Sequence, residues 1–264
     1  MNRSVEALAA YLQHTFHTRS KYTLHSPFIY NFYKKVLTNH EEYPQYRLMY
    51  KVRRELLLKS RFIKRKDLGS KARESVCDQR FVRVRDIVRR SGVAPRKGEL
   101  LFRIAQEYQP DFILELGTSL GISTMYFSAA RPESKIITIE ACLDSANVAR
   151  QNFDHYGMKN IALLPGSFEE KLQEALEQFP RLDMVFFDGN HRKEPTLRYF
   201  EQCLQHIHPG TVFIFDDIHW SAEMSEAWST IQRHPQVKVT VDLYHLGLVF
   251  FREELSKEDF RLRF

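Results

Sequence analysis

The sequence predicts an α/β fold in which a doubly wound, mostly parallel sheet of seven strands carries helices on both faces. From about residue 76 onward, short apolar runs alternate with segments of helical apolar spacing, and strict alternation of this kind builds a parallel sheet. The runs are continuously apolar, as expected for strands covered on both sides. The last two runs, within residues 238–252, follow each other without a helix. They predict an antiparallel hairpin at the sheet edge.

Each element follows from its local pattern. Apolar runs bounded by turn residues predict strands at 111–117, 135–141, 160–166, 182–189 and 211–217, and a pair within 238–252 that is joined near Gly247. Helical spacing predicts helices at 98–109, 122–131, 145–157, 168–179, 195–207 and 223–234. Gly157 ends the third of these helices, because glycine adopts the left-handed conformation that closes a helix.

Residues 1–75 lack the alternation of strand and helix patterns that residues 76–264 show, and they contain no convincing strand. We therefore expect an N-terminal helical extension followed by the main domain. Helical spacing covers 5–16, 27–39 and the basic segment 46–66. Ser26 before Pro27 is typical of a helix start. Aromatic residues are dense in this part. They favour a helical layer packed on the main domain, and the alternative is a lid over a ligand.

Bulk composition narrows the class of protein. A chain of 264 residues with 43% hydrophobic residues suits one compact domain, or one domain with a small extension. Cys77, Cys142 and Cys203 lie far apart, which argues against a disulfide framework or a zinc site and fits a reducing compartment. The start lacks a long apolar segment, and no stretch approaches the roughly 20 apolar residues of a membrane span. We therefore expect a soluble cytoplasmic protein.

The loops after the first three strands carry residues suited to a ligand, which binds beyond the carboxyl ends of strands in such sheets. Glycines in the first loop allow a tight turn and close approach of a ligand, and an acid after the second strand commonly accepts hydrogen bonds from a ribose. The residues concerned are Glu115, Gly117, Thr118, Ser119, Gly121, Glu140 and, after the third strand, Gly166 and Ser167. They favour an adenosine-containing ligand, and an ordinary strand-to-helix turn is the alternative. A dinucleotide fingerprint and a Walker lysine are absent.

Three carboxylates follow the fourth and fifth strands: Asp188, Asp216 and Asp217. Because the strands adjoin in the expected topology, we expect these side chains to meet at the ligand edge, where unpaired carboxylates repel each other. A divalent cation would remove that repulsion, and oxygen ligands favour Mg²⁺, with Ca²⁺ or Mn²⁺ as alternatives. The other interpretation is that the acids cap helices or pair with Arg192 or Lys193.

Four motifs together, "ILELGTSLGIST", "IITIEA", "MVFFDGNH" and "TVFIFDDIHW", resemble the class I S-adenosylmethionine-dependent methyltransferases, which have a Rossmann-like fold. Within that class the chain is similar to the metal-dependent O-methyltransferases of the catechol and caffeoyl-CoA type, over roughly residues 95–252. The resemblance implies that S-adenosylmethionine binds at the loop and acid residues named above, together with Asp188. It also implies a metal site at Asp188, Asp216 and Asp217.

Two positions depart from the pattern of this family. Asp217 stands where the family usually has Asn. Some related sugar O-methyltransferases carry Asp-Asp at these two positions, so the departure bears more on the acceptor than on the metal. His191 stands where the family has a lysine base. Histidine can act as a base near neutral pH, so we predict that His191 is the catalytic base, with Lys193 as the substitute. The alternative is a structural or exposed histidine.

The acceptor is left open by the sequence. The predicted function is methyl transfer to a hydroxyl of a small molecule. Residues 47–73 are strongly basic; they form either a solvated helix face or a contact with RNA phosphates. Some bacterial relatives of the family that this chain resembles methylate a hydroxylated tRNA base, so the resemblance implies a second prediction, methylation of such a base. A non-catalytic S-adenosylmethionine-binding module is the third, and the oligomeric state, homodimer included, stays open.

Overall fold

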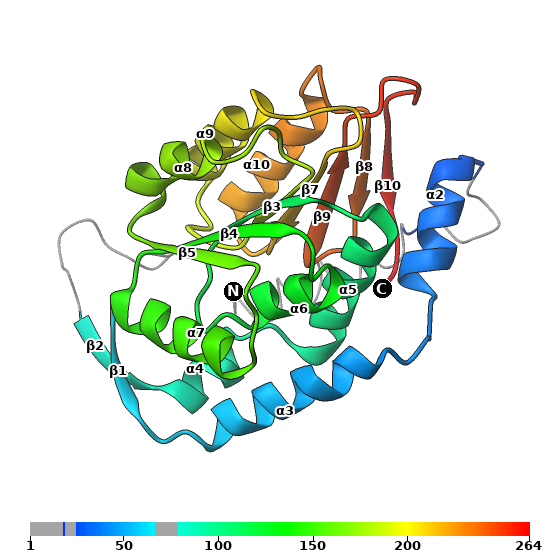
Figure 1. The fold of residues 1–264 in the computed structure, drawn as a ribbon. Helices are drawn as coiled ribbons and strands as arrows, with labels where there is room; N and C mark the ends of the chain where they lie inside the picture. The colour runs from blue at the N-terminus through cyan, green and yellow to red at the C-terminus, as the bar shows by residue number, and fades with distance from the viewer. Residues whose placement is uncertain (1–17, 19–24, 67–78) are drawn as a thin grey trace, which may run out of the picture.

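The computed structural model describes residue 18 and residues 25–66 and 79–264 (Figure 1). Its centre is a mixed sheet with the order β10-β8-β9-β7-β6-β3-β4-β5. The strands are β3 (Phe112–Leu116), β4 (Lys135–Glu140), β5 (Ile161–Pro165), β6 (Met184–Phe187), β7 (Val212–Asp216), β8 (Val239–Asp242), β9 (Leu246–Phe250) and β10 (Glu258–Arg261). The predicted α/β class, with a mostly parallel sheet and antiparallel strands toward one edge, is confirmed.

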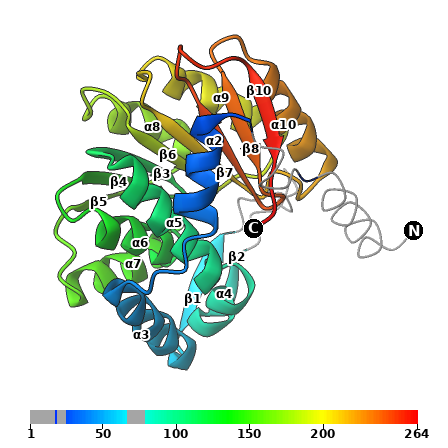
Figure 2. The same cartoon turned by 90° about the vertical axis from the view of Figure 1, so that its right-hand side faces the viewer.

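Helices cover both faces of this sheet, as Figures 1 and 2 show. One face packs against α8 (Phe168–Leu176), α9 (Lys193–Leu204) and α10 (Ala222–Arg233). The other packs against α5 (Pro95–Tyr108), α6 (Ile122–Ala130) and α7 (Leu143–His155), which share a core with α3 (Pro44–Leu58) and α4 (Val84–Arg90). Neighbouring residues of a strand point to opposite faces, so Ile113 joins one core and Leu114 the other.

The strand order reverses at β3, which lies between β4 and β6. Chain connections leave the carboxyl ends of β3 and β6 in opposite directions, and this geometry leaves a crevice for a ligand at the switch point. β6 is in turn parallel to β7. The ends of β3, β6 and β7 therefore bring the glycine loop and the acidic residues to one edge.

The amino-terminal part confirms one predicted element and corrects another. Helix α2 (Pro27–Phe32) begins as predicted, since the Ser26 side chain accepts a hydrogen bond from the Ile29 amide, and it continues as a π-helix over Tyr33–Leu37. Its Phe28 packs edge-to-face on Phe250 of β9 at 5.0 Å. The helix expected over 5–16 lies outside the described residues.

The helix expected over 46–66 is confirmed as far as Leu58 and wrong beyond it, and the expectation of no strand before residue 75 was wrong. Helix α3 ends at Leu58, and β1 (Phe62–Lys66) pairs antiparallel with β2 (Gln79–Arg83). Ile63 is buried opposite Val82, and this pairing with a distant partner overrides the local helical pattern. The β1–β2 ladder joins residues on either side of the predicted boundary between 75 and 76.

The sheet edge differs in detail from the prediction. The β8–β9 turn lies at 243–245, and Gly247 lies within β9, where an added Cβ would be 2.6 Å from the Trp228 ring. Within the described residues an eighth strand, β10, lies parallel to β8 and forms the edge. Its short, polar sequence gave no strand signal.

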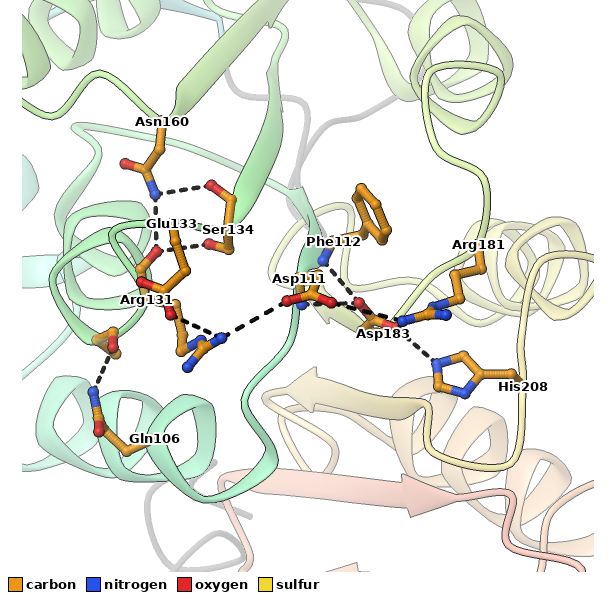
Figure 3. Close-up of polar contacts among 11 residues, drawn as sticks. Gln106, Asp111, Phe112, Arg131, Glu133, Ser134, Asn160, Arg181, Asp183 and His208 are labelled. Atoms are coloured by element: carbon orange, nitrogen blue, oxygen red, sulfur yellow. Dashed lines mark hydrogen bonds and ion pairs between the residues drawn. The ribbon is translucent and has the colours of Figure 1, made fainter.

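A cavity of about 350 Å³ lies at the end of the sheet where β3, β6 and β7 begin. It is lined by α2 and by the loops before these strands. Four of its polar or charged groups, Asp111, Arg181, Asp183 and His208, form one network (Figure 3). Asp183 accepts hydrogen bonds from the amides of Asp111 and Phe112, and it pairs with Arg181 and His208 at 2.9 and 2.8 Å. This network ties the strand starts together, at the end remote from the acidic cluster.

No described helix is long and apolar enough to cross a bilayer.

Candidate active site

The glycine loop after β3 is shaped by its contact with the end of β6. Gly117 has φ +111°, and a Cβ there would lie 2.0 Å from the Asp188 carbonyl oxygen. Only glycine combines this backbone conformation with so close an approach. Gly121, also at positive φ, begins α6 against the Phe153 ring. The loop is therefore built to hold the backbone at the sheet edge, as the sequence predicts.

Glu140, at the end of β4, holds the same loop. One of its oxygens accepts a hydrogen bond from the Ser119 amide at 2.7 Å, and the other from the Cys142 amide at 2.8 Å. Burial raises the pKa of Glu140, and the two amide bonds act in the opposite direction. Each carboxylate oxygen keeps acceptor capacity, so the residue can anchor the loop and still receive a ribose hydroxyl.

Two buried polar atoms of this region have no hydrogen-bond partner among the described residues: Glu115 Oε1 and the Ser119 hydroxyl. The second oxygen of Glu115 accepts hydrogen bonds from Thr124 and Thr138, and burial raises the pKa of this fully buried carboxyl. Unsatisfied buried polar groups are costly, so their presence beside the loop points to a polar ligand. Thr118, in contrast, is buried and bonded to Thr138 at 2.6 Å.

The loop after β5 uses its predicted residues for local structure. Gly166 has φ +146°, and its amide donates to the Glu140 carbonyl at 3.0 Å. Ser167 caps α8: its hydroxyl accepts from the Glu170 amide while the Glu170 side chain accepts from the Ser167 amide. The capping box fixes the loop beside Glu140. A contact of Ser167 with an adenine stays a prediction.

The three predicted acids form a cluster at the ends of β6 and β7. Asp216 is 4% exposed, and its Oδ1 accepts from the amide of Asp217, which has φ +54°. Asp and Asn tolerate this left-handed conformation. Burial, and then the charge of Asp216, raises the pKa of Asp188 well above its ordinary value, and the same two causes raise the pKa of Asp217.

Lys97, in the first turn of α5, brings a cation into this cluster. Its ammonium group donates a hydrogen bond to Asp216 Oδ2. Burial lowers the pKa of Lys97, but the charges of the three acids and the hydrogen bond to Asp216 together raise it by more, so the net shift is upward. Sequence reasoning missed this residue. The available signal was "APRKGE": cations are unfavourable in the first turn of a helix, and this helix has no acid there.

The cations proposed as alternative partners of the acids are engaged elsewhere. Arg192 donates to the Asn190 side chain at 2.9 Å, and Lys193 binds Glu226 of α10 at 2.9 Å. Both contacts lead away from the acidic cluster and weaken the case for Lys193 as a substitute base. His191 lies beside the cluster, with Nε2 3.8 Å from Asp188 Oδ1.

The cluster does not fit a divalent metal in this arrangement. Among the residues that the structure describes, no three Asp, Glu, His or Cys side chains converge closely enough to hold an ion. Lys97 already occupies one oxygen of Asp216, the most buried of the three acids. The donor set is chemically suited to Mg²⁺, but its geometry is arranged around an ammonium group.

Comparison with known proteins agrees with this geometry. Residues 114–218 match a family model described as a methyltransferase domain. A catechol O-methyltransferase from Niastella koreensis is 33% identical over 129 residues, which cover 48% of this chain and 58% of that protein. The chain thus spans less than two thirds of that relative. The catechol O-methyltransferase of Sus scrofa is 28% identical, over 48% of this chain and 70% of its own length.

Solved structures show the same fold. The cofactor-bound structure of Rv0187 from MTB has a TM-score of 0.54 and 25% identity, over 62% of this chain and 84% of its own. The O-methyltransferase from Bacillus cereus in complex with SAH has a TM-score of 0.54 and covers 84% of this chain and 97% of its own, at 19% identity, a likeness of fold alone. Together with the matched sequence, the switch-point loop and Glu140, these likenesses identify a class I S-adenosylmethionine-dependent methyltransferase domain in this chain, related to the catechol O-methyltransferases.

Proposed function

We propose that this protein transfers the methyl group of S-adenosylmethionine to a hydroxyl oxygen of a small molecule. The observation that carries the proposal is the juxtaposition, at one sheet edge, of the glycine loop held by Glu140 and the acidic cluster with His191. The first can hold an adenosine-containing cofactor, and the second offers proton acceptors beside it. The relationship to the catechol O-methyltransferases supports the choice of oxygen as the acceptor atom.

The loop residues fit the cofactor. The Ser119 hydroxyl and Glu115 Oε1 are buried polar atoms without a partner in the described part of the chain, so a ligand can satisfy them, and Glu140 keeps acceptor capacity for a ribose. Gly117 and Gly121 leave the backbone free of side chains where the ligand must approach. When bound, S-adenosylmethionine supplies a methyl group on a positively charged sulfur, which an oxygen nucleophile can attack.

The chain's own task is to position the acceptor hydroxyl and to take its proton. His191 is the proposed base, because an imidazole titrates near neutral pH and its Nε2 lies beside Asp188. The carboxylate can fix the orientation of the ring and favour its protonated form after the transfer. The proton thus passes from the acceptor oxygen to the ring nitrogen of His191 that does not face Asp188, while the oxygen gains the methyl group and the sulfur keeps the electron pair of the broken carbon–sulfur bond.

The magnesium implied by the resemblance is not used in this proposal. The three acids do not converge on a common point suited to an ion, and Asp216 is bonded to Lys97. We therefore derive no step through a metal. The carboxylates keep a role that does not need one, since they can accept hydrogen bonds from the acceptor hydroxyl or from a neighbouring oxygen.

RNA stays the second candidate acceptor because of one surface. The β1–β2 hairpin exposes Phe62 and Phe81, at 53% and 71%, and the Arg83 guanidinium lies 4.9 Å from the Phe62 ring centroid. β1 reaches the cofactor edge, where the Lys64 amide donates to Asp144. Exposed aromatics beside cations are suited to stacking on unpaired bases.

One experiment tests the function and separates the acceptors. The purified protein is incubated with methyl-labelled S-adenosylmethionine and a metabolite-plus-RNA extract, and the label is separated by size before and after ribonuclease. Label in small molecules supports the proposal. Label in large material that ribonuclease releases would move the assignment to RNA. Cofactor binding without transfer from a complete extract would count for a non-catalytic binding module.

A further inference from the structure

The position of Lys97 is unusual for a lysine. Its side chain is 23% exposed, it lies in the positive first turn of α5, and its ammonium is bonded to Asp216, whose side chain is 5% exposed. The helix dipole and the loss of hydration both disfavour a cation there. Only the surrounding carboxylates offset these costs, since Asp216, Asp188 and Asp217 all stabilise the charged form.

The other charged groups at the cluster do not replace Lys97. His191 and His245 act electrostatically on Asp217, and neither is a permanent cation. Of the described lysines and arginines, Lys97 is the one bonded to a carboxylate of the cluster. The helix backbone beside Lys97 lies close to α6, because Gly98 packs directly against the Tyr126 ring, where an added Cβ would be 2.1 Å away.

We propose, on the basis of the methyltransferase function above, that Lys97 is the built-in cation of this site. Its ammonium group takes the position among Asp188, Asp216 and Asp217 where a divalent ion would otherwise be needed, and it holds Asp216 toward the acceptor. The folded wild-type site consequently binds no divalent cation, and methyl transfer proceeds in its absence. Removing the ammonium frees Asp216 Oδ2, so that the three carboxylates, which do not converge on an ion while Lys97 is bonded to Asp216, can draw together around one.

The test is a titration of the full chain with Mn²⁺, followed by electron paramagnetic resonance of the free ion. We expect wild type and Lys97→Arg to leave Mn²⁺ free. Lys97→Met should bind it at least about tenfold more tightly, because the positive charge that repels the metal cation has been removed. Adding Asp216→Asn to Lys97→Met should abolish the gain. Lys35→Met removes a lysine from another lysine–carboxylate pair, with Glu107 at the far end of the sheet, and should gain no binding.

Activity supplies an independent readout. Wild-type transfer should be unchanged by EDTA, and Lys97→Met should lose transfer in EDTA and recover it with Mn²⁺ or Mg²⁺. Wild type that binds Mn²⁺ as tightly as Lys97→Met, or that stops working in EDTA, would overturn the inference. If Lys97→Met does not fold, the titrations of wild type and Lys97→Arg still decide. If no acceptor is ever methylated, the proposed function fails, while the Mn²⁺ titration still tests Lys97.

Discussion

Lys97 and Asp216 are 119 positions apart in the chain, and the ammonium of one is hydrogen-bonded to the carboxylate of the other at the edge of the sheet. The contact joins the first turn of α5 to the last residue of β7. It places Asp216, the least exposed acid of the cluster, in an ion pair. Asp188 and Asp217 have raised pKa values, from burial and then from the charge of Asp216.

Asp216→Asn should separate catalysis from cofactor binding. The neutral amide cannot balance the charge of Lys97, and its oxygen accepts weaker hydrogen bonds than a carboxylate does. We therefore expect methyl transfer to fall on the order of a hundredfold. The affinity for S-adenosylmethionine, measured by calorimetry, should stay within about twofold, because Glu140 and the glycine loop are untouched.

The matched control is Asp183→Asn. Asp183 directly precedes β6, at the end of the sheet opposite to the acidic cluster. Asp183 accepts bonds from two amides and pairs with Arg181 and His208. Its substitution should lower stability and leave the turnover of the folded protein near that of wild type. Equal loss of turnover in both variants would argue that Asp216 is merely structural.

Gly117→Ala should be among the most destabilising single-methyl additions. The new Cβ would lie 2.0 Å from the Asp188 carbonyl at a backbone φ of +111°, so β3 and β6 must separate. We expect a loss of about 2–4 kcal/mol in the free energy of unfolding. Gly157→Ala is the control, since it has φ +67° with nothing within 4 Å and should cost only about 1 kcal/mol. Urea denaturation of both variants measures the difference, and similar losses would refute the steric argument.

Glu115 should make stability depend on pH. Burial raises its pKa above the ordinary value of 4.5, against the hydrogen bonds from Thr124 and Thr138, which act in the opposite direction. A carboxyl with a raised pKa binds its proton more tightly in the folded state. Its contribution therefore favours folding below pH 4.5, and it is lost progressively as the pH rises through the folded-state pKa.

Glu115→Gln removes that titration. The variant should match wild type in acid and exceed its melting temperature by about 2–4 °C per kcal/mol gained near neutral pH, while binding S-adenosylmethionine less tightly. Melting curves from pH 4 to pH 8 measure the effect, with the exposed Glu253→Gln as a control that should follow wild type. A variant less stable than wild type at neutral pH would show that the ionised carboxylate is needed for folding.

The sheet and its helices could be predicted from sequence because their signals are local. Continuous apolar runs such as Met184–Phe187 and the 3.6-residue spacing of α5 each reflect burial of a single element. The order of the strands and the identity of the acids then placed Asp188 beside Asp216. Where two distant segments decide the structure, local pattern failed. Phe62–Lys66 forms a strand only because Gln79–Arg83 lies beside it.

The same reason explains what was missed at the site. Three carboxylates without a visible partner suggested a metal, and Arg192 and Lys193 were the nearest cations in sequence. Their contacts are instead with Asn190, in the same loop, and with Glu226 of α10. The actual partner, Lys97, lies on a helix that precedes β3. No local pattern connects it to Asp216.

His191→Gln tests the proposed base. Glutamine keeps hydrogen-bonding capacity without a titratable nitrogen, so turnover at neutral pH should fall by about 10²-fold with little change in S-adenosylmethionine affinity. The loss should shrink as the pH rises, because an acceptor hydroxyl that ionises by itself no longer needs a base. The measurement is turnover of wild type and variant from pH 6 to pH 10. Lys193→Gln is the control, and its ion pair with Glu226 predicts turnover close to wild type at every pH. A pH-independent loss in His191→Gln would assign the residue to positioning, and a larger loss in Lys193→Gln would return the base to the lysine.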